Sequence, residues 1–523
     1  MQGIPEVHAL SREEKIGQLL CLGWSEATQQ DDARTVNAHA RAVVEEMRAG
    51  SLVLMSRNVG APEPLRALIA ELNALAAIPL LVGVDQEGGW ITRLGPPFTA
   101  FPGNMALGAI PGEQAEAYAR RQAQAIAQEL LAVGINWNFA PVVDVNNNPN
   151  NPIIGIRSFG EDLERVARLG AAAIDGTQQS GLLACAKHFP GHGDTSVDSH
   201  LALPTIPYGR ERLESIELPP FRAAIAAGVG SIMTTHILFP ALDAHNPATL
   251  SSAILNGLLR RDLGYGGVVI TDCLEMHAIS RTVGTARGAV EAIKAGADMA
   301  LICHTLSTQR EAWQALLKVV ETGELPETRL DEAVGRVLAA KRRLAAGSPS
   351  TNAAPWKDPA HAALESEIAH AAITVIRNTG AIPIPPDASL LVISTHPAGP
   401  KLAHALERHR STVPFLKIDK GFPAAQVEEA LRAAGETAVI VTTAPLPPVE
   451  DAPALFLKSL IQACGDRLIV VGLREPYDLR RFPDIPNYLC AYGSRPCQLE
   501  ALTDALCGIY QPAGRLPVTV PGK

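Results

Sequence analysis

The segment Lys187–His200, which reads KHFPGHGDTSVDSH, carries the densest group of chemically active side chains in this 523-residue chain. The residues in it that could transfer protons, bind anions or ligate metals are Lys187, His188, His192, Asp194, Asp198 and His200. The apolar run LLACA directly precedes the segment and predicts a buried strand. Polar loops that leave the ends of buried strands often hold the functional residues of α/β proteins. We therefore expect a functional site here, serving either acid–base catalysis or metal binding.

Metal binding would use the histidines of this segment. His188 and His192 lie four residues apart, and His200 and Asp194 could complete a ligand set. A helix would be needed to bring the first two onto one face, but Pro190 and Gly191 between them, with Gly193 directly after, break helical geometry. We therefore expect no metal and no other cofactor. His192 and Asp194 are expected to shape the loop instead, through bonds to backbone groups.

The composition predicts a folded chain of two or three domains. Hydrophobic residues make up 47% and charged residues 19% of the sequence, which is typical of globular proteins. A net charge of −9 argues against a general nucleic-acid binder. The eight cysteines form no CxxC pair, which favours reduced, packed thiols. We see no secretory signal and no run of eighteen apolar residues, so we expect a cytoplasmic protein without membrane partners.

The first two thirds of the chain alternate short apolar runs with helical periodicity. The predicted strands are Leu19–Leu22, Ser51–Met55, Leu80–Val84, Ile135–Val145, Leu182–Ala186, Ser231–Thr235, Gly267–Thr271 and Met299–Ile302. About eight strand–helix units over this length predict a (β/α)₈ barrel of the TIM type. A doubly wound sheet is the competing architecture, but no GxGxxG fingerprint follows an early strand.

A second α/β alternation follows a segment rich in Gly, Ser and Pro. We therefore predict a barrel domain over residues 1–345, a linker over residues 346–359, and a smaller α/β sandwich domain over residues 360–523. The strands predicted in the smaller domain lie near Leu390–Ile393, Ala438–Thr442, Leu468–Gly472 and Tyr488–Ala491.

Polar residues follow several of the predicted barrel strands. They are Asp85, Lys187, His188, His236 and Asp272. Because the carboxyl ends of barrel strands meet on one face, these side chains are expected to share one site.

Four motifs in this order resemble glycoside hydrolase family 3. They are VGVDQEGG (residues 82–89), IRSFGED (156–162), KHFPGHGDTSVDSH (187–200) and ITDCLEM (270–276). The triplet DSH and the RNVG after SLVLMS resemble its β-N-acetylglucosaminidase branch, the type that trims muropeptides in peptidoglycan recycling. The resemblance covers roughly residues 10 to 345, and the closing GRLPVTVP extends it weakly to the second domain.

The resemblance implies a retaining glycosidase in which Asp272 is the nucleophile. It also implies that Asp198 and His200 form the acid/base dyad, in place of the second carboxylate that most glycosidases use. A carboxylate bound to one imidazole nitrogen fixes the tautomer, so the other nitrogen can donate and accept the proton. Without the resemblance, Asp272 could cap a helix before LEMHAI, Asp198 could cap a turn, and His200 could be a surface residue.

The residues that match the sugar-binding positions of the family are Asp85, Arg93, Arg157, Lys187 and His188. Carboxylates accept hydrogen bonds from sugar hydroxyls, whereas Lys and Arg donate them. A structural ion pair between Asp85 and Arg93 is the competing interpretation. The sequence departs from the family at Trp90, where a basic residue is common, and this ring could stack on a sugar or aglycone or fill core space.

The expected activity is removal of terminal non-reducing β-N-acetylglucosamine, with a small carbohydrate as the only predicted partner. A phosphorylase using the same residues would also fit, because an imidazole donor does not repel phosphate as a carboxylate would. Two further candidate functions are a non-catalytic carbohydrate-binding barrel and a β-glucosidase of the same family. The natural aglycone and the oligomeric state stay open.

Overall fold

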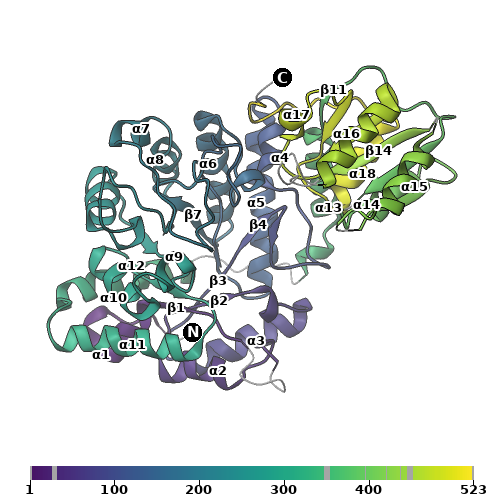
Figure 1. Cartoon of the computed structure of the whole chain (residues 1–523). Coiled ribbons are helices and arrows are strands. Elements are labelled where there is room, and N and C mark those ends of the chain that lie inside the picture. The colour runs from purple at the N-terminus through teal and green to yellow at the C-terminus, as the bar shows by residue number, and fades with distance from the viewer. Residues whose placement is uncertain are drawn as a thin grey trace.

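The computed structural model describes residues 3–25, 32–346, 354–394, 396–419, 421–435, 437–443 and 452–520. Its main elements form an eight-stranded sheet and a six-stranded sheet, each with its own helices, and the two units lie side by side (Figure 1).

The eight-stranded sheet is a parallel barrel. Its strands are β1 (Leu20–Leu22), β2 (Ser51–Leu54), β3 (Leu81–Val84), β6 (Trp137–Asn138), β7 (Leu183–Phe189), β8 (Ser231–Thr234), β9 (Val268–Ile270) and β10 (Ala300–Ile302). They follow the order β10-β1-β2-β3-β6-β7-β8-β9, and a parallel bridge from Ile270 to Met299 joins the two ends. The predicted (β/α)₈ barrel is therefore confirmed.

Helices surround this barrel. They are α1 (Arg12–Gln18), α2 (Ala38–Arg41), α3 (Pro62–Leu75), α4 (Asn104–Ala109), α5 (Gln114–Ala132), α6 (Leu163–Gln179), α7 (Arg210–Ser215), α8 (Leu218–Ala226), α9 (His277–Ser280), α10 (Thr285–Ala295), α11 (Leu306–Glu321) and α12 (Glu327–Ala345). A π-helical turn, Ala253–Asp262, connects β8 to β9. Local signals start several of these helices. Ser11 and Glu14 form a capping box at α1, and the Asp162 carboxylate accepts two backbone N–H groups at the start of α6.

Large side chains fill the barrel interior. Trp137 and Phe139 pack edge to face with ring centroids 4.9 Å apart, and the indole N–H of Trp137 donates to Ser231. A Cβ at Gly83 would stand 2.5 Å from the Phe139 ring, so only glycine fits on β3 beside this ring. The packed interior leaves room for a site only where the strands end.

Two strands differ from their predicted lengths. The run Ile135–Val145 forms a ladder only at β6, with one further bridge from Val142 to Lys187. Pro141 lies between them and has no N–H for a continued ladder. Strand β7 instead continues to Phe189, so Lys187 and His188 lie on the strand and not in the loop after it.

The six-stranded sheet belongs to the predicted α/β sandwich. Its order is β11 (Thr374–Arg377), β16 (Asn487–Cys490), β15 (Leu468–Gly472), β14 (Ala438–Thr443), β12 (Leu390–Ser394) and β13 (Phe415–Lys417), with only β11 antiparallel. Its helices are α13 (Pro359–Ala372), α14 (Gly399–Leu406), α15 (Ala424–Ala434), α16 (Ala452–Cys464), α17 (Asp478–Arg481) and α18 (Pro496–Leu506). Two short edge strands, β11 and β13, were not predicted from the sequence. Half of the predicted linker, residues 347–353, lies outside the described residues.

A short hairpin, β4 (Gln86–Gly88) and β5 (Ile91–Thr92), leaves the barrel after β3. It contacts the unit that contains the six-stranded sheet. The Arg495 guanidinium donates to the carbonyl oxygen of Gly89 at its tip, with Nε 3.0 Å away. Gly88 and Gly89 have φ of 85° and 58°, a conformation that favours glycine at the turn. Elsewhere in the interface, His361 Nδ1 lies 2.9 Å from Glu129 Oε1. None of the helices in the described ranges is long and apolar enough to cross a membrane.

Candidate active site

A cavity of about 460 Å³ lies at the carboxyl ends of the barrel strands. Most of the predicted site residues line it, namely Asp85, Arg93, Arg157, Lys187, His188, His200 and Asp272. Asp198 is attached to the same site through its hydrogen bond to His200. The structure thus brings together residues that are up to 187 positions apart in the sequence, from Asp85 to Asp272.

Asp272 stands two residues after β9, at the rim of the packed interior. The N–H of Cys273 donates to its Oδ1 over 2.7 Å. Burial raises the pKa of Asp272, but the imidazoles of His236 and His188, the Cys273 N–H and His200 outweigh burial and hold the pKa below its usual value. The carboxylate is therefore ionised at neutral pH. It does not cap a helix, because the next one, α9, has Met276 as its N-cap.

His200 and Asp198 form a hydrogen-bonded pair on the loop after β7. Asp198 Oδ1 accepts from both the backbone N and the Nδ1 of His200, each over 2.8 Å. Since an ionised carboxylate only accepts hydrogen bonds, Nδ1 carries the proton and Nε2 is left for another partner. The His200 side chain is 55% exposed, so Nε2 is open to exchange protons with a substrate or with water.

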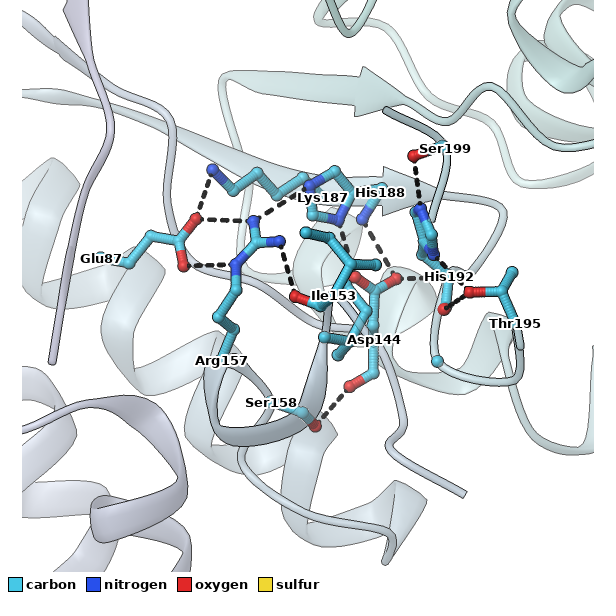
Figure 2. A network of polar contacts seen from close by, with 12 residues as sticks. Glu87, Asp144, Ile153, Arg157, Ser158, Lys187, His188, His192, Thr195 and Ser199 are labelled. Carbon is cyan, nitrogen blue, oxygen red and sulfur yellow. Dashed lines mark hydrogen bonds and ion pairs between the residues drawn. The ribbon is translucent and has the colours of Figure 1, made fainter. Parts of the chain in front are cut away.

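A network of ion pairs lines the same cavity. Lys187 Nζ lies 2.8 Å from Asp85 Oδ1 and 2.7 Å from Glu87 Oε1. Arg157 donates two hydrogen bonds to the Glu87 carboxylate, of 3.0 Å from Nε and 2.9 Å from Nη2 (Figure 2). Arg93 Nη2 reaches Asp85 Oδ2 at 3.4 Å, so the expected structural pair between these two residues is present. Each of these groups is held in one orientation by an opposite charge.

The charges of this network also fix its protonation. Burial raises the pKa of Asp85, but Lys187 and Arg93 overcome burial and hold the pKa far below its usual value. The pKa of Glu87 is lowered in the same way, against burial, by Arg157 and Lys187. Both carboxylates are therefore ionised and can accept hydrogen bonds from sugar hydroxyls.

Sequence reasoning missed Glu87 and Asp144. The Asp144 side chain is fully buried, and its Oδ2 lies 2.7 Å from Nδ1 of His188. Its Oδ1 accepts the backbone N–H groups of His188 and His192, over 3.2 and 2.8 Å (Figure 2). Asp144 thereby orients the His188 ring and anchors the start of the loop after β7. Two signals could have found them, since Glu87 lies inside the VGVDQEGG motif and Asp144 is the single charge in Ile135–Val145.

The buried His192 side chain stabilises the loop after β7 through hydrogen bonds within the loop. Its ring nitrogens lie 3.0 Å from the hydroxyl oxygens of Thr195 and Ser199. The predicted loop-shaping role is therefore observed, although the partners are hydroxyl groups and not the expected backbone groups. Asp194 pairs with Arg212, whose Nη2 lies 3.3 Å away.

This histidine predicts a loss of stability in acid. Burial, followed by the charge of His188, lowers the pKa of His192 to about 4. Between pH 6.5 and 4 the unfolded chain binds a proton there that the native chain does not, so stability falls as the pH falls. The expected contribution of His192 to this loss in the free energy of unfolding is about 3 kcal/mol, at 1.36 kcal/mol for each unit by which its pKa is lowered. Urea unfolding at pH 7.5 and pH 4.5 measures it.

His192→Gln should lose this share of the pH dependence, whereas His245→Gln, at an exposed histidine, should keep it. Equal pH dependence in the two variants would contradict a neutral, buried His192.

Within the described residues, one group could hold a metal ion. It consists of Cys273, Cys303 and His304, whose ligand atoms lie within 4.8 Å of one another on the cavity wall. His188 and His192, the pair considered from the sequence, are not part of it. Their Nδ1 atoms bind Asp144 and Thr195.

A closed parallel barrel with an ionised carboxylate, a histidine–aspartate pair and ion-paired polar groups at its carboxyl end is the framework of a carbohydrate-processing barrel enzyme. The model for "Glycosyl hydrolase family 3 N terminal domain" matches residues 11–340. The chain therefore belongs to glycosyl hydrolase family 3, and it is a glycoside hydrolase.

Relatives match nearly the whole chain. It is 33% identical over 533 residues to Beta-hexosaminidase A of Pseudoalteromonas piscicida, covering 90% of this chain and 89% of the relative. It is 30% identical over 561 residues to a Beta-N-acetylglucosaminidase/beta-glucosidase of Cellulomonas fimi, covering 97% and 94%. A solved family 3 beta-N-acetylglucosaminidase from Paenibacillus sp. str. FPU-7 is 39% identical, with a TM-score of 0.90 over 98% of this chain and all of that one.

Proposed function

We propose that this protein is a retaining exo-β-N-acetylglucosaminidase that releases terminal non-reducing N-acetylglucosamine. One observation carries the proposal. The ionised Asp272 and the Asp198-bound His200 line the same cavity, and the charge of His200 contributes to the lowered pKa of Asp272. The names of the relatives support the same substrate class.

In the first step, the carboxylate of Asp272 forms a bond to the anomeric carbon while the glycosidic bond breaks. In its imidazolium form, with Nδ1–H on Asp198, His200 gives the proton of Nε2 to the leaving oxygen, so the aglycone departs as an alcohol. In the second step, His200 takes a proton from water, the water oxygen bonds to the anomeric carbon, and the carboxylate of Asp272 is released. Two displacements on one carbon retain its configuration.

The binding residues would hold the sugar during both steps. Asp85 accepts hydrogen bonds from hydroxyl groups, and Lys187, Arg157 and Arg93 offer donors. Nε2 of His188, which lies 3.3 Å from Nη2 of Arg157, adds an acceptor. Because these side chains already hold one another in place, they need little reordering when a sugar binds.

We further propose that residues 1–345 form the catalytic domain, residues 346–359 the linker, and residues 360–523 a second domain. For the physiological role we propose trimming of muropeptides during peptidoglycan recycling. The support for this role is the DSH triplet at residues 198–200 and its resemblance to that branch of the family.

The assay of this function is nitrophenol release from 4-nitrophenyl N-acetyl-β-glucosaminide, with the matching glucoside as control. We expect turnover of the aminosugar and little of the glucoside. No release from either substrate between pH 5 and 8 would favour a non-catalytic binding barrel. The reaction is repeated in phosphate buffer, where N-acetylglucosamine is the expected product and N-acetylglucosamine 1-phosphate would identify a phosphorylase instead.

A further inference from the structure

Trp90 stands on the wall of the catalytic cavity, where the sequence departs from the family pattern. Its side chain is 45% exposed, so it does not fill core space. The guanidinium carbon of Arg474, from the second sheet's unit, lies 3.8 Å from the centre of its ring. One face of the indole is therefore covered by a cation and is not available for stacking on a sugar.

Arg474 keeps hydrogen-bonding capacity in this position. Its Nη2 donates to Glu475 Oε1 over 3.2 Å. Its Nε is buried and has no hydrogen-bond partner within the described ranges. A planar guanidinium fixed on an aromatic face, with donors left at its edge, matches the geometry of a carboxylate.

Arg474 also lines a second cavity, of about 730 Å³, between the two units. Trp90 borders the catalytic cavity, and the contact between Trp90 and Arg474 links the two spaces. Two neighbouring residues of the barrel unit also link the two cavities. Ile153 lines the catalytic cavity, and Pro152 lines the second cavity. An aglycone that leaves the catalytic cavity along this wall meets Arg474 first.

The second cavity is positively charged. Arg474, Arg480 and Arg481 line it, against Glu475 and Asp478. Arg480 Nη1 donates to the neutral Asn150 side chain over 2.9 Å. Asp478 faces inward, where its Oδ2 accepts hydrogen bonds from Thr443 and Tyr488 over 2.6 and 2.9 Å. Burial raises the pKa of Asp478 to about 6.

The position of Arg474 in its own fold agrees with a binding role. It lies two residues after β15, at the carboxyl end of a parallel strand, where open α/β sheets bind ligands. Arg495 holds the hairpin that carries Trp90 against the same unit, so the two sides of the contact are fixed together.

We propose that Arg474, held on the face of Trp90, forms a subsite for a carboxylate carried by the aglycone. The proposal rests on the glycosidase function proposed above and assigns the second domain a part in substrate choice. Arg474 is a specificity residue here and takes no part in bond cleavage. A neutral aglycone passes the subsite without this contact.

The test compares two pairs of substrates of closely matched shape, in each of which one member carries a carboxylate and the other a neutral carboxamide. They are the N-acetyl-β-glucosaminides of 3- and 4-hydroxybenzoic acid, each with the corresponding hydroxybenzamide glycoside. In the native enzyme at least one acid is expected to have a higher kcat/KM than its amide. Arg474→Met should lower kcat/KM for that acid about 10- to 100-fold, as expected for a lost charged hydrogen bond. Its kcat/KM for the amide should stay within about twofold.

Two further variants separate recognition from structure. Arg474→Lys should retain part of the preference, since it keeps the charge and loses the planar fork. Arg432→Met, at an exposed arginine of α15 that lines neither cavity, should leave the acid-to-amide ratio unchanged. An equal loss on acid and amide, or an unchanged ratio in Arg474→Met, would overturn the subsite.

Failure of the glycosidase function gives a different result. In that case neither glycoside is cleaved by the native enzyme, and calorimetric binding of the acid and amide glycosides still tests the subsite. Tighter binding of the acid, lost in Arg474→Met, supports it, whereas equal binding of both overturns it.

Discussion

Asp272→Ala is expected to lower kcat by about 10⁴-fold or more on every substrate, while the protein stays folded. A loss of this size is expected because Asp272 is the proposed nucleophile, whereas the cavity carboxylates Asp85 and Glu87 are already paired with Lys187. The residue stands at the rim of the barrel interior with one hydrogen bond to its own neighbour, from Cys273 N–H. Steady-state kinetics with the nitrophenyl glycoside measure the effect, and thermal unfolding checks the fold.

Two controls sharpen this prediction. Asp272→Asn keeps the size of the side chain and removes its charge, so it should be as inactive as the alanine variant. Asp175→Ala removes a partly exposed carboxylate of α6 that pairs only with Arg120 in the described structure, and it should keep normal kcat. Activity retained in Asp272→Asn would show that the nucleophile lies elsewhere.

His200→Ala is expected to slow different substrates unequally. Protonation of the leaving oxygen matters most when the aglycone is a poor leaving group. Turnover of a chitobiose or alkyl glycoside should therefore fall about 10²- to 10⁴-fold. A dinitrophenyl glycoside leaves without protonation, so its first step should change only several-fold. Measuring kcat/KM across a series of phenol leaving groups gives the dependence directly.

The exposure of His200 makes this variant easy to interpret. Its side chain is 55% exposed, so the alanine variant should differ from the native protein by less than about 0.5 kcal/mol in stability. Asp198→Ala should show the same leaving-group pattern in weaker form, because His200 would lose the partner of its Nδ1. Equal losses for good and poor leaving groups would contradict His200 as the proton donor.

Much of the barrel could be predicted because its strands are buried on both faces. Short, continuously apolar runs such as Leu80–Val84 and Leu182–Ala186 stand out against the amphipathic helices between them. The run Ile135–Val145 misled this reasoning, since apolar character alone does not reveal that Pro141 interrupts the ladder. The edge strand β13 was missed for the opposite reason, because it is only partly buried and has no strong pattern.

The sequence by itself determined the class of fold, the place of the site at the carboxyl ends of the strands, and the residue types that gather there. These follow from local hydrophobic patterns and from motifs within single loops. Only the tertiary structure decided which charges meet. It pairs Glu87 with Arg157 and Lys187, and Asp144 with His188. It also covers one face of Trp90 with Arg474, a residue 384 positions further along the chain. The physical reason is that ion pairs and ring contacts act over a few ångströms between elements far apart in sequence, and spacing along the chain does not encode such distances.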